Sequence, residues 1–471
     1  RRSPRAPRRP ATAPAAPTST ALRIAVLPIA APAGDDAALH GLAPVLTGEL
    51  IARLAAHTRH RVISPASVER FSAEARDLGA AIAQLQVDRV VVASLTQRAG
   101  GLDLDVQLIA RDQTLVWASR WSRPRDDLQL LWEDAARGLA QRLGVTTQAA
   151  TAARDPAAYR AYLEGRHHWA RRSGESLRRA ITYFEQAVAL DPDYVQAWVA
   201  MAHAYLILPW NGPTPRAEAN AKAAAALGRA LVLDPTSAAA HAARGNHLTE
   251  AEWKWHEAIV AFRRAIELDP GNADAHQWLG EALLYLRRFD EADAELRIAL
   301  DLAPLAAATY RAHGKILHYA GRYVESEAAW RKALELDPEQ PWSSYGLGYA
   351  LGMQGRFDEA RAAIAADRMY RLPGTAPYLT VQWAWLARQR GDQRELARIA
   401  AQLDAGELAQ VTPWTQAFAL AVLGRTDQML AALERGLAER DQWMPFTAVN
   451  REFDPYRQHP RFVAVMAGLG L

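Results

Sequence analysis

The stretch "RRAIELDPGNADAHQWLGEALLYLRRFDEADAELRIALDLAP", residues 263–304, contains nearly the same phrase twice. Residues 265–270 read AIELDP, and residues 299–304 read ALDLAP. Each phrase ends in proline, which cannot continue a helix because it lacks an N–H and clashes with the preceding turn. The return of this ending with nearly the same preceding residues predicts a chain built from one repeated helical unit.

The interval is close to 34 residues over the middle of the chain. A second landmark keeps the same spacing, as RFDEA at 288–292, GRYVE at 321–325 and GRFDEA at 355–360. A period near 34 with a proline closing each unit is typical of helix-turn-helix solenoid repeats. Spaced by 43, 35, 34, 34 and 35 residues, the closing prolines are Pro192, Pro235, Pro270, Pro304, Pro338 and, more loosely, Pro373.

The unit over residues 273–304 shows what each position does. Four residues of its first helix fall at i, i+3, i+4 and i+7, which places them on one helix face: His276, Leu279, Gly280 and Leu283. A glycine in mid-helix costs about 1 kcal/mol, so we expect another helix to cross closely at Gly280. We also expect Asp290 to be the N-cap of the second helix.

These residues resemble the tetratricopeptide repeat (TPR) family. The next units match it at Gly314, Trp330 and Pro338, and at Gly348 and Ala360. Residues 245–246, Gly-Asn, depart from the usual Leu-Gly, and about nine extra residues surround LPWNGPTPR at 208–216. The resemblance implies an all-α superhelical solenoid. Weaker units continue through the glycine turns at Gly391 and Gly424, so we count roughly seven helix pairs over residues 155–440.

Composition sets outer limits on function. The chain has 471 residues, of which 50% are hydrophobic and 23% charged, as in ordinary soluble proteins. The absence of cysteine excludes disulfides and cysteine-based metal sites. No run of about 18 apolar residues occurs, so we predict no membrane-spanning segment. Because the sequence starts with Arg1 and not Met, we expect a fragment of a longer protein.

The basic isoelectric point, about 9.1, arises from one end of the chain. Residues 1–20 hold five arginines and no acidic residue. Subtracting these five charges from the net charge of +3 leaves −2 for the rest. We therefore predict a disordered Pro/Ala/Arg linker over residues 1–20 and no direct nucleic-acid binding by the remainder. A spacer next to an upstream membrane tether is the alternative.

Residues 21–147 predict a compact α/β domain. Residues 22–30 form a nearly continuous apolar run, typical of a buried strand. Gly100 and Gly101 separate two strand-like runs and indicate a hairpin. The predicted order is βαβ(αα)βββα, with strands over 22–30, 60–65, 88–100, 102–112 and 114–121, and helices over 39–54, two short stretches to about 85, and 127–143.

This segment resembles the TolB-like amino-terminal domain of bacterial signalling proteins. The matching stretches are IAVLPI at 24–29, GLAPVLTGELIARLA at 41–55 and the strand-rich region 87–124. Residues 27–29 have Ile where Phe is more common, and a usual Phe-Ala-Asp-Gly loop is missing around 36–41.

The TolB-like resemblance implies an output domain upstream. In that family the output is a winged-helix DNA-binding domain tethered by a membrane helix, a class III nucleotide cyclase or a Ser/Thr kinase. The first would place this region on the periplasmic side of the inner membrane. Five arginines directly after a membrane helix would oppose translocation, so a cytoplasmic location stays open.

Residues 441–471 resemble the ending of the same class of proteins, with Asp454-Pro455 and Pro460–Phe462 in matching positions. We expect this segment to cap the open apolar end of the solenoid. The covering side chains would be Trp443, Phe453, Phe462 and Val465.

No enzymatic motif is present. The sequence lacks a phosphate loop, a dinucleotide fingerprint, HExxH and a nucleophile elbow, so we expect no catalytic, cofactor-binding or metal site. His167 and His168 project about 100° apart on a helix, which predicts one packed and one solvated ring. Asp103 and Asp105 should share a solvated sheet face, and we predict that Trp198, Trp278 and Trp330 belong to the core.

The first helix of each TPR unit lines the concave groove in this family. That resemblance predicts a peptide-binding groove with cations beside aromatic rings, although a solvated groove without a ligand is the alternative. The two-Lys, two-Asn clamp of chaperone-tail-binding repeats is not reproduced. The predicted groove residues are Gln277, Glu281, Tyr285, Arg311, Lys315, His318, Tyr319, Trp342, Tyr345 and Tyr349, with Asp274 and Met353 beside them.

Together these features predict a non-enzymatic protein-interaction and sensing module, as in the sensory part of a bacterial transcriptional regulator. The regulatory region of a nucleotide cyclase or kinase, and a free-standing scaffold for envelope assembly, are the alternatives.

Overall fold

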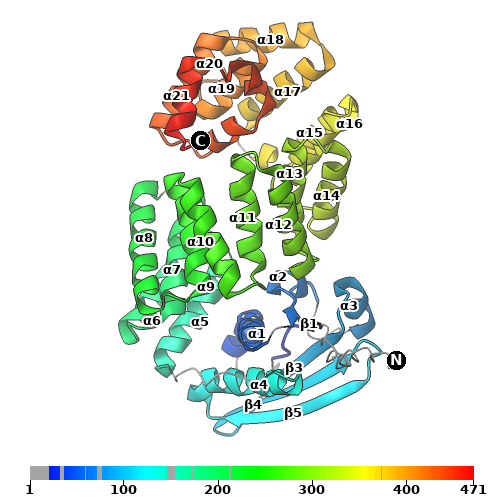
Figure 1. The fold of residues 1–471 in the computed structure, drawn as a ribbon, viewed down its shortest axis with the longest axis vertical. Helices are drawn as coiled ribbons and strands as arrows, with labels where there is room; N and C mark the ends of the chain where they lie inside the picture. Colours follow the sequence, from blue (N-terminus) through cyan, green and yellow to red (C-terminus); the bar gives the residue numbers. More distant parts are fainter. Residues whose placement is uncertain are drawn as a thin grey trace, which may run out of the picture.

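The computed structural model describes residues 21–31, 37–58, 60–71, 77–145, 154–171, 173–211, 214–372 and 374–471. This part of the chain is mostly helical, with a five-stranded mixed sheet near its N-terminus (Figure 1). The predicted linker over residues 1–20 and Pro373 lie outside the described residues.

The sheet confirms the predicted order βαβ(αα)βββα. β1 runs parallel to both β2 and β3, and β3, β4 and β5 form an antiparallel meander, so the strand order is β2-β1-β3-β4-β5. The predicted hairpin joins β3 to β4, and Gly100 takes a φ of 79°, which favours glycine because it has no Cβ. The strands are β1 (Arg23–Val26), β2 (Arg61–Val62), β3 (Arg89–Arg98), β4 (Gly101–Ala110) and β5 (Leu115–Arg123).

Two helices of this α/β unit connect it with the solenoid. α1 contacts both α4 and the first solenoid helix, and Leu46, Leu50 and Trp132 on α1 and α4 are fully buried. One hydrophobic cluster runs from the sheet through these helices to α9. The α/β unit and the first repeats therefore share a core. Its helices are α1 (Ala37–His57), α2 (Pro65–Val68), α3 (Leu78–Leu85) and α4 (Leu128–Arg142).

The described solenoid consists of eight helix pairs, where the repeat spacing predicts roughly seven. Consecutive helices pack against each other from α5 to α18, and α19 then packs on α17. The pairs are α5 (Pro156–Ala170) with α6 (Gly174–Leu190), α7 (Val195–Ile207) with α8 (Arg216–Leu233), α9 (Ala238–His247) with α10 (Trp255–Leu268), α11 (Ala273–Tyr285) with α12 (Phe289–Leu302), α13 (Ala307–Tyr319) with α14 (Tyr323–Leu336), α15 (Ser343–Gly352) with α16 (Phe357–Ala366), α17 (Ala376–Arg390) with α18 (Gln393–Asp404), and α19 (Pro413–Val422) with α20 (Thr426–Ala438).

The close crossing expected at Gly280 is present. A Cβ at this position would lie 2.1 Å from Leu296 Cδ2 and 3.1 Å from the Ala292 carbonyl oxygen of the paired helix. The predicted N-cap at Asp290 is wrong, because α12 begins at Phe289 with Arg288 as its N-cap. The preceding residue, Arg287, has a φ of 61°, and this left-handed turn starts the helix earlier than the acidic residues suggested.

Several single-residue predictions are corrected. Trp330 is buried, but Trp198 and Trp278 are only half-buried at the edge of the core. Both His167 and His168 are half-buried, so the prediction of one solvated ring is wrong. His168 stacks on Tyr183 with ring centroids 5.4 Å apart, and this contact covers it.

The two predicted strand acids do lie on one face of the sheet. Asp103 pairs with Arg98 at 2.8 Å, and Asp105 pairs with Arg120 at 2.7 Å. Both aspartates are half-buried beneath these arginines, so the face is less solvated than predicted.

The α/β unit also contacts the middle of the solenoid. Asp301, near the end of α12, forms ion pairs with both Arg23 and Arg61. The Ser64 amide donates to the Leu302 carbonyl at 3.0 Å. The unit is therefore held at two places far apart in sequence, α5 and the end of α12.

The C-terminal segment does more than cap the last repeat. Phe453, Phe462 and Val465 are buried against α19 and α20, but other parts of the segment lie beside the third and fourth pairs (Figure 1). There Trp255 Nε1 donates to the Leu469 carbonyl at 2.6 Å, and Arg287 donates to the Ala448 carbonyl at 3.1 Å. Its elements are η5 (Met444–Ala448), η6 (Arg451–Tyr456) and α21 (Pro460–Gly468).

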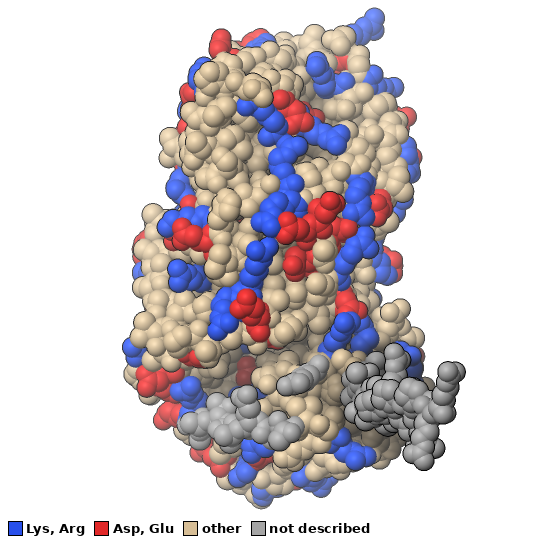
Figure 2. Space-filling view, viewed as in Figure 1, with Lys and Arg blue, Asp and Glu red and all other residues tan. Residues whose placement is uncertain are grey.

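Every helix in the described residues is too short or too polar to cross a lipid bilayer. On the face seen in Figure 2, basic side chains form bands beside acidic ones over the middle repeats.

Candidate functional site

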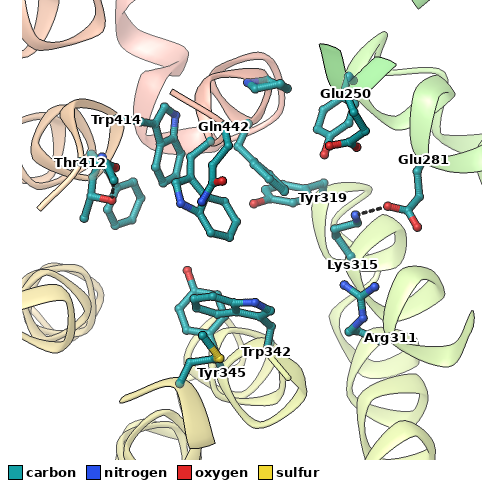
Figure 3. A pocket seen from close by; sticks show the side chains of 18 of the residues that line it. Glu250, Glu281, Arg311, Lys315, Tyr319, Trp342, Tyr345, Thr412, Trp414 and Gln442 are labelled. Carbon is teal, nitrogen blue, oxygen red and sulfur yellow. Dashed lines mark hydrogen bonds and ion pairs between the residues drawn. The ribbon is translucent and has the colours of Figure 1, made fainter. Parts of the chain in front are cut away.

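A cavity of about 550 Å³ lies on the concave side of the solenoid, and we call it the chamber. First helices of successive pairs, from α11 to α19, supply most of its wall, and the segment after α20 closes it (Figure 3). Among the residues that line it are Arg216, Glu250, Trp253, Glu281, Tyr285, Arg311, Lys315, His318, Tyr319, Trp342, Tyr345, Tyr349, Tyr370, Tyr378, Thr412, Trp414, Phe418, Arg440, Gln442, Trp443 and Phe446.

One wall of the chamber is charged. Lys315 donates to Glu281 at 2.6 Å, and this pair lies between Glu250 on one side and Arg311 on the other (Figure 3). Burial opposes ionisation of Glu281, but the charges of Lys315 and Arg311 outweigh it and lower its pKa. Glu281 and Lys315 thus neutralise each other.

Two charged groups on this wall lack such a partner. Arg311 is half-buried and makes no hydrogen bond or ion pair with any other described residue. Glu250 faces the chamber, and its pKa is raised by the desolvation that the surrounding protein imposes and by the charge of Glu281. A half-enclosed, unpaired guanidinium gains free energy from an added acceptor, because hydrogen bonds to charged groups are the stronger kind.

The opposite wall is aromatic. Trp342 contacts Tyr345, Tyr370 and Trp443 edge-to-face, with ring centroids 5.9, 6.2 and 5.3 Å apart. Trp414 stacks on Phe418 at 5.7 Å. Such rings present apolar area together with the polar tips of tyrosine and tryptophan.

The C-terminal segment completes the chamber, which sequence reasoning missed. Phe446 contacts the rings of Tyr285 and Tyr319 at 5.4 and 6.0 Å, and the Lys315 ammonium lies 5.8 Å from its centroid. Gln442 accepts a hydrogen bond from Arg216 at 2.9 Å. Trp443 was expected to cap the solenoid end but lies in the chamber wall, because the chain turns back directly after α20. The only sequence signal for this was the aromatic content of residues 443–453.

Nine of the ten predicted groove residues line the chamber. The exception, Gln277, lies nearer the start of α11, where it donates to Glu281 and accepts from Thr309. Of the two residues beside them, Asp274 does not line the chamber and Met353 lines a second cavity of about 370 Å³. His318, Tyr319 and Tyr349 separate the two cavities and line both.

His318 is the most perturbed histidine of the site. Burial, reinforced by nearby Arg451, lowers its pKa to about 4, so its ring is neutral at physiological pH. Its Nδ1 atom is buried without a hydrogen-bond partner in the described structure. Among the described residues, no cluster of three His, Asp or Glu side chains could hold a metal ion.

The comparisons with known proteins identify the repeats. The TPR repeat family matches residues 254–286 and 314–355, which include α10, α11, the C-terminal part of α13, and α14 and α15. These segments supply Glu281, Lys315 and Tyr345 to the chamber. No curated protein matches the chain.

Solved structures with similar segments have low overall similarity. PilF of Pseudomonas aeruginosa is 22% identical, with a TM-score of 0.37 and coverage of 45% of this chain and 90% of PilF. YrrB, a TPR protein with an unusual peptide-binding site, is 18% identical, with a TM-score of 0.30 and coverage of 46% and 97%. Human IFIT1, in a dimer with PPP-AAAA, is 12% identical, with a TM-score of 0.42 and coverage of 73% and 77%.

Proposed function

We propose that this chain is a non-enzymatic binding and sensing module whose ligand occupies the chamber. The observation that supports this most is the convergence of nine predicted groove residues and the C-terminal segment on one cavity. Its volume, about 550 Å³, falls within the roughly 300–1,000 Å³ of small-molecule sites. Its lining combines aromatic area with a few unpaired polar groups, which is the usual composition of such sites.

The chamber changes the kind of ligand that the concave face would accept. TPR repeats serve protein interaction, and an open groove would suit an extended peptide. Here Phe446 covers Tyr285 and Tyr319 from the concave side. A ligand that reaches Arg311 and Trp342 must therefore fit inside the chamber, as a small molecule or as one end of a chain.

We infer further that the α/β unit reads the state of the chamber, as in the sensory region of a signalling protein. α12 packs between α11 and α13, which both line the chamber, and its C-terminal end holds Arg23 and Arg61 through Asp301. A shift of α11 or α13 on ligand binding would thus reach the α/β unit through one helix. The TolB-like resemblance of residues 24–29 and 87–124 supports the same assignment, with a transcriptional regulator as the favoured context.

Binding in the chamber can be tested with indole, a neutral aromatic probe, by isothermal titration calorimetry on the full chain. We expect saturable binding that Ala251→Phe weakens, because residue 251 lines the chamber and a phenyl ring would occupy part of its volume. Ala362→Phe, at an exposed position on α16, is the matched control and should bind normally. Equal binding by both variants, or no binding by the unmodified chain, would contradict the proposal.

A further inference from the structure

We infer that the chamber is built for a small aromatic carboxylate, with the Arg311 guanidinium holding the carboxylate and the opposite wall receiving the ring. The inference rests on the proposed function, because it names the ligand class of the same site. It follows from which charges in the chamber are already paired and which are not.

The cations of the chamber differ in whether they already have a hydrogen-bond, ion-pair or aromatic partner. Lys315 is paired with Glu281, Arg216 donates to Gln442, and Arg440 lies 4.3 Å from the Trp253 ring centroid and donates to the Ala251 carbonyl. Arg311 has no hydrogen-bond or ion-pair partner in the described residues. It is therefore the cation from which a ligand gains most, since a half-enclosed guanidinium without a hydrogen-bond or ion-pair partner has lost hydration that nothing replaces.

The overall charge of the chamber also favours an anion. Four cations line it, at positions 216, 311, 315 and 440, against the two carboxylates of Glu250 and Glu281. His318 is neutral at physiological pH. The raised pKa of Glu250 makes its negative charge easier to lose, which shifts the balance further toward a positive chamber.

A carboxylate matches this site better than a phosphate. The planar guanidinium fork fits the two oxygens of a carboxylate in a bidentate arrangement. One unpaired arginine balances one negative charge, whereas a phosphate dianion calls for several donors, as at helix N-termini and glycine-rich loops. Arg311 itself projects from the second turn of α13 (Ala307–Tyr319) and not from a helix N-terminus.

The aromatic wall selects the rest of the ligand. Trp342, Tyr345 and Trp443 already pack edge-to-face and can extend this arrangement to one more ring. A carboxylate joined to an aromatic ring occurs both in free aromatic amino-acid derivatives and at the end of a peptide with a C-terminal aromatic residue. Both sources share the chemistry that the chamber recognises.

The test compares N-acetyl-L-tryptophan with N-acetyl-L-tryptophanamide, which differ only in the carboxylate, by calorimetric titration of the full chain. We expect the acid to bind at least about tenfold tighter, the gain of one charge-assisted hydrogen-bonded pair. Arg311→Gln should remove this preference. Arg440→Gln also removes one positive charge from the chamber but should keep most of the preference, because its guanidinium is already engaged. Unchanged far-ultraviolet circular dichroism confirms that both variants fold.

Further arms separate the ligand sources and the two proposals. Equal affinity of acetyl-Gly-Gly-Trp with a free carboxylate would identify a chain end as an accepted ligand, and much weaker affinity would identify a free molecule. Tighter binding of phenyl phosphate, or an equal affinity for acid and amide, would overturn the carboxylate inference. If indole still binds in that case, the proposed function stands. If neither indole nor the acid binds, both proposals fail.

Discussion

Gly348 shows how one missing side chain sets the distance between two helices. A Cβ at this position of α15 would lie 2.8 Å from the Ala360 carbonyl oxygen and 2.5 Å from Ile364 Cγ1 on α16. The carbonyl oxygen belongs to the backbone, so it cannot move aside as a side chain can. Gly228 on α8 offers the opposite case, because no atom lies within 4 Å of the position that its Cβ would take.

We therefore expect Gly348→Ala to lower the free energy of unfolding by about 1–3 kcal/mol through overpacking. Gly228→Ala should raise it by about 0.5–1 kcal/mol, because alanine has the higher helix propensity. Urea denaturation of both variants measures the difference. Equal effects of the two substitutions would contradict the helix crossing described here.

His318 predicts an acid sensitivity. Its pKa is about 4 in the folded chain and about 6.5 in the unfolded chain. Between these values the unfolded chain binds a proton that the folded chain does not, so stability is lost as pH falls from 6.5 toward 4. His318→Phe keeps the ring and should make the loss of unfolding free energy between pH 7 and 4.5 smaller by about 2 kcal/mol. An identical loss in both proteins, measured by urea denaturation, would contradict the burial of this ring.

At the scale of the helices, the repeated arginine before each second helix links neighbouring repeats. Arg322 pairs with Glu325 on its own helix and with Asp293 on the preceding second helix, at 2.6 Å. Arg356 repeats this one unit later, with Glu359 and with Glu327 at 2.7 Å. The arginine of the RF/RY landmark thus belongs to a series of ion pairs that links neighbouring repeats, which we call the ion-pair ladder. Arg288 lacks the second partner, because the equivalent position on α10 is Ile259.

This difference supplies a matched pair of variants. Arg322→Met should lower the free energy of unfolding by about 1–2 kcal/mol, because it leaves the buried Asp293 with one partner fewer. Arg288→Met removes only an exposed pair within one helix turn and should cost less than about 0.5 kcal/mol. Thermal melting at low and high salt measures both costs, and the destabilisation by Arg322→Met should persist at high salt. Equal costs would mean that the ladder does not couple the repeats.

Most of the elements could be predicted because their signals are local. Helix faces, closing prolines and the Gly100 hairpin each lie within a few residues of the structure that they specify. Asp290 was misassigned because Arg287 replaces the glycine found at the equivalent turns, Gly321 and Gly355, and still takes a positive φ. The local sequence pattern does not indicate that an arginine can replace glycine at this turn.

At the scale of the whole molecule, the candidate site was only half predictable. The groove residues of α11, α13 and α15 follow from the repeat register, and nine of them meet in the chamber. The closing wall, with Trp443 and Phe446, comes from a segment more than 120 residues away from Tyr319 in sequence. No periodicity connects the two segments, so only the tertiary structure shows that the C-terminal segment walls the expected open groove into a chamber.

The contact of the α/β unit with α12 makes a prediction at the same scale. Asp301→Ala removes the shared partner of Arg23 and Arg61 and should speed hydrogen exchange in residues 61–67, by about fivefold for a loss of roughly 1 kcal/mol. Glu335 occupies the same place one repeat later, and its one ion pair within the described residues is with Lys332 on its own helix. Glu335→Ala should leave exchange in residues 61–67 unchanged, and an equal effect of both substitutions would contradict this docking.

The most direct test of the central claim is hydrogen exchange of the full chain with and without saturating indole, followed by mass spectrometry. Binding in the chamber predicts slower exchange in α13, α15 and residues 440–446, whose side chains form its walls. Transmission through α12 predicts a smaller change in residues 61–67. Slower exchange confined to other regions, with these segments unchanged, would contradict the assignment of the chamber as the ligand site.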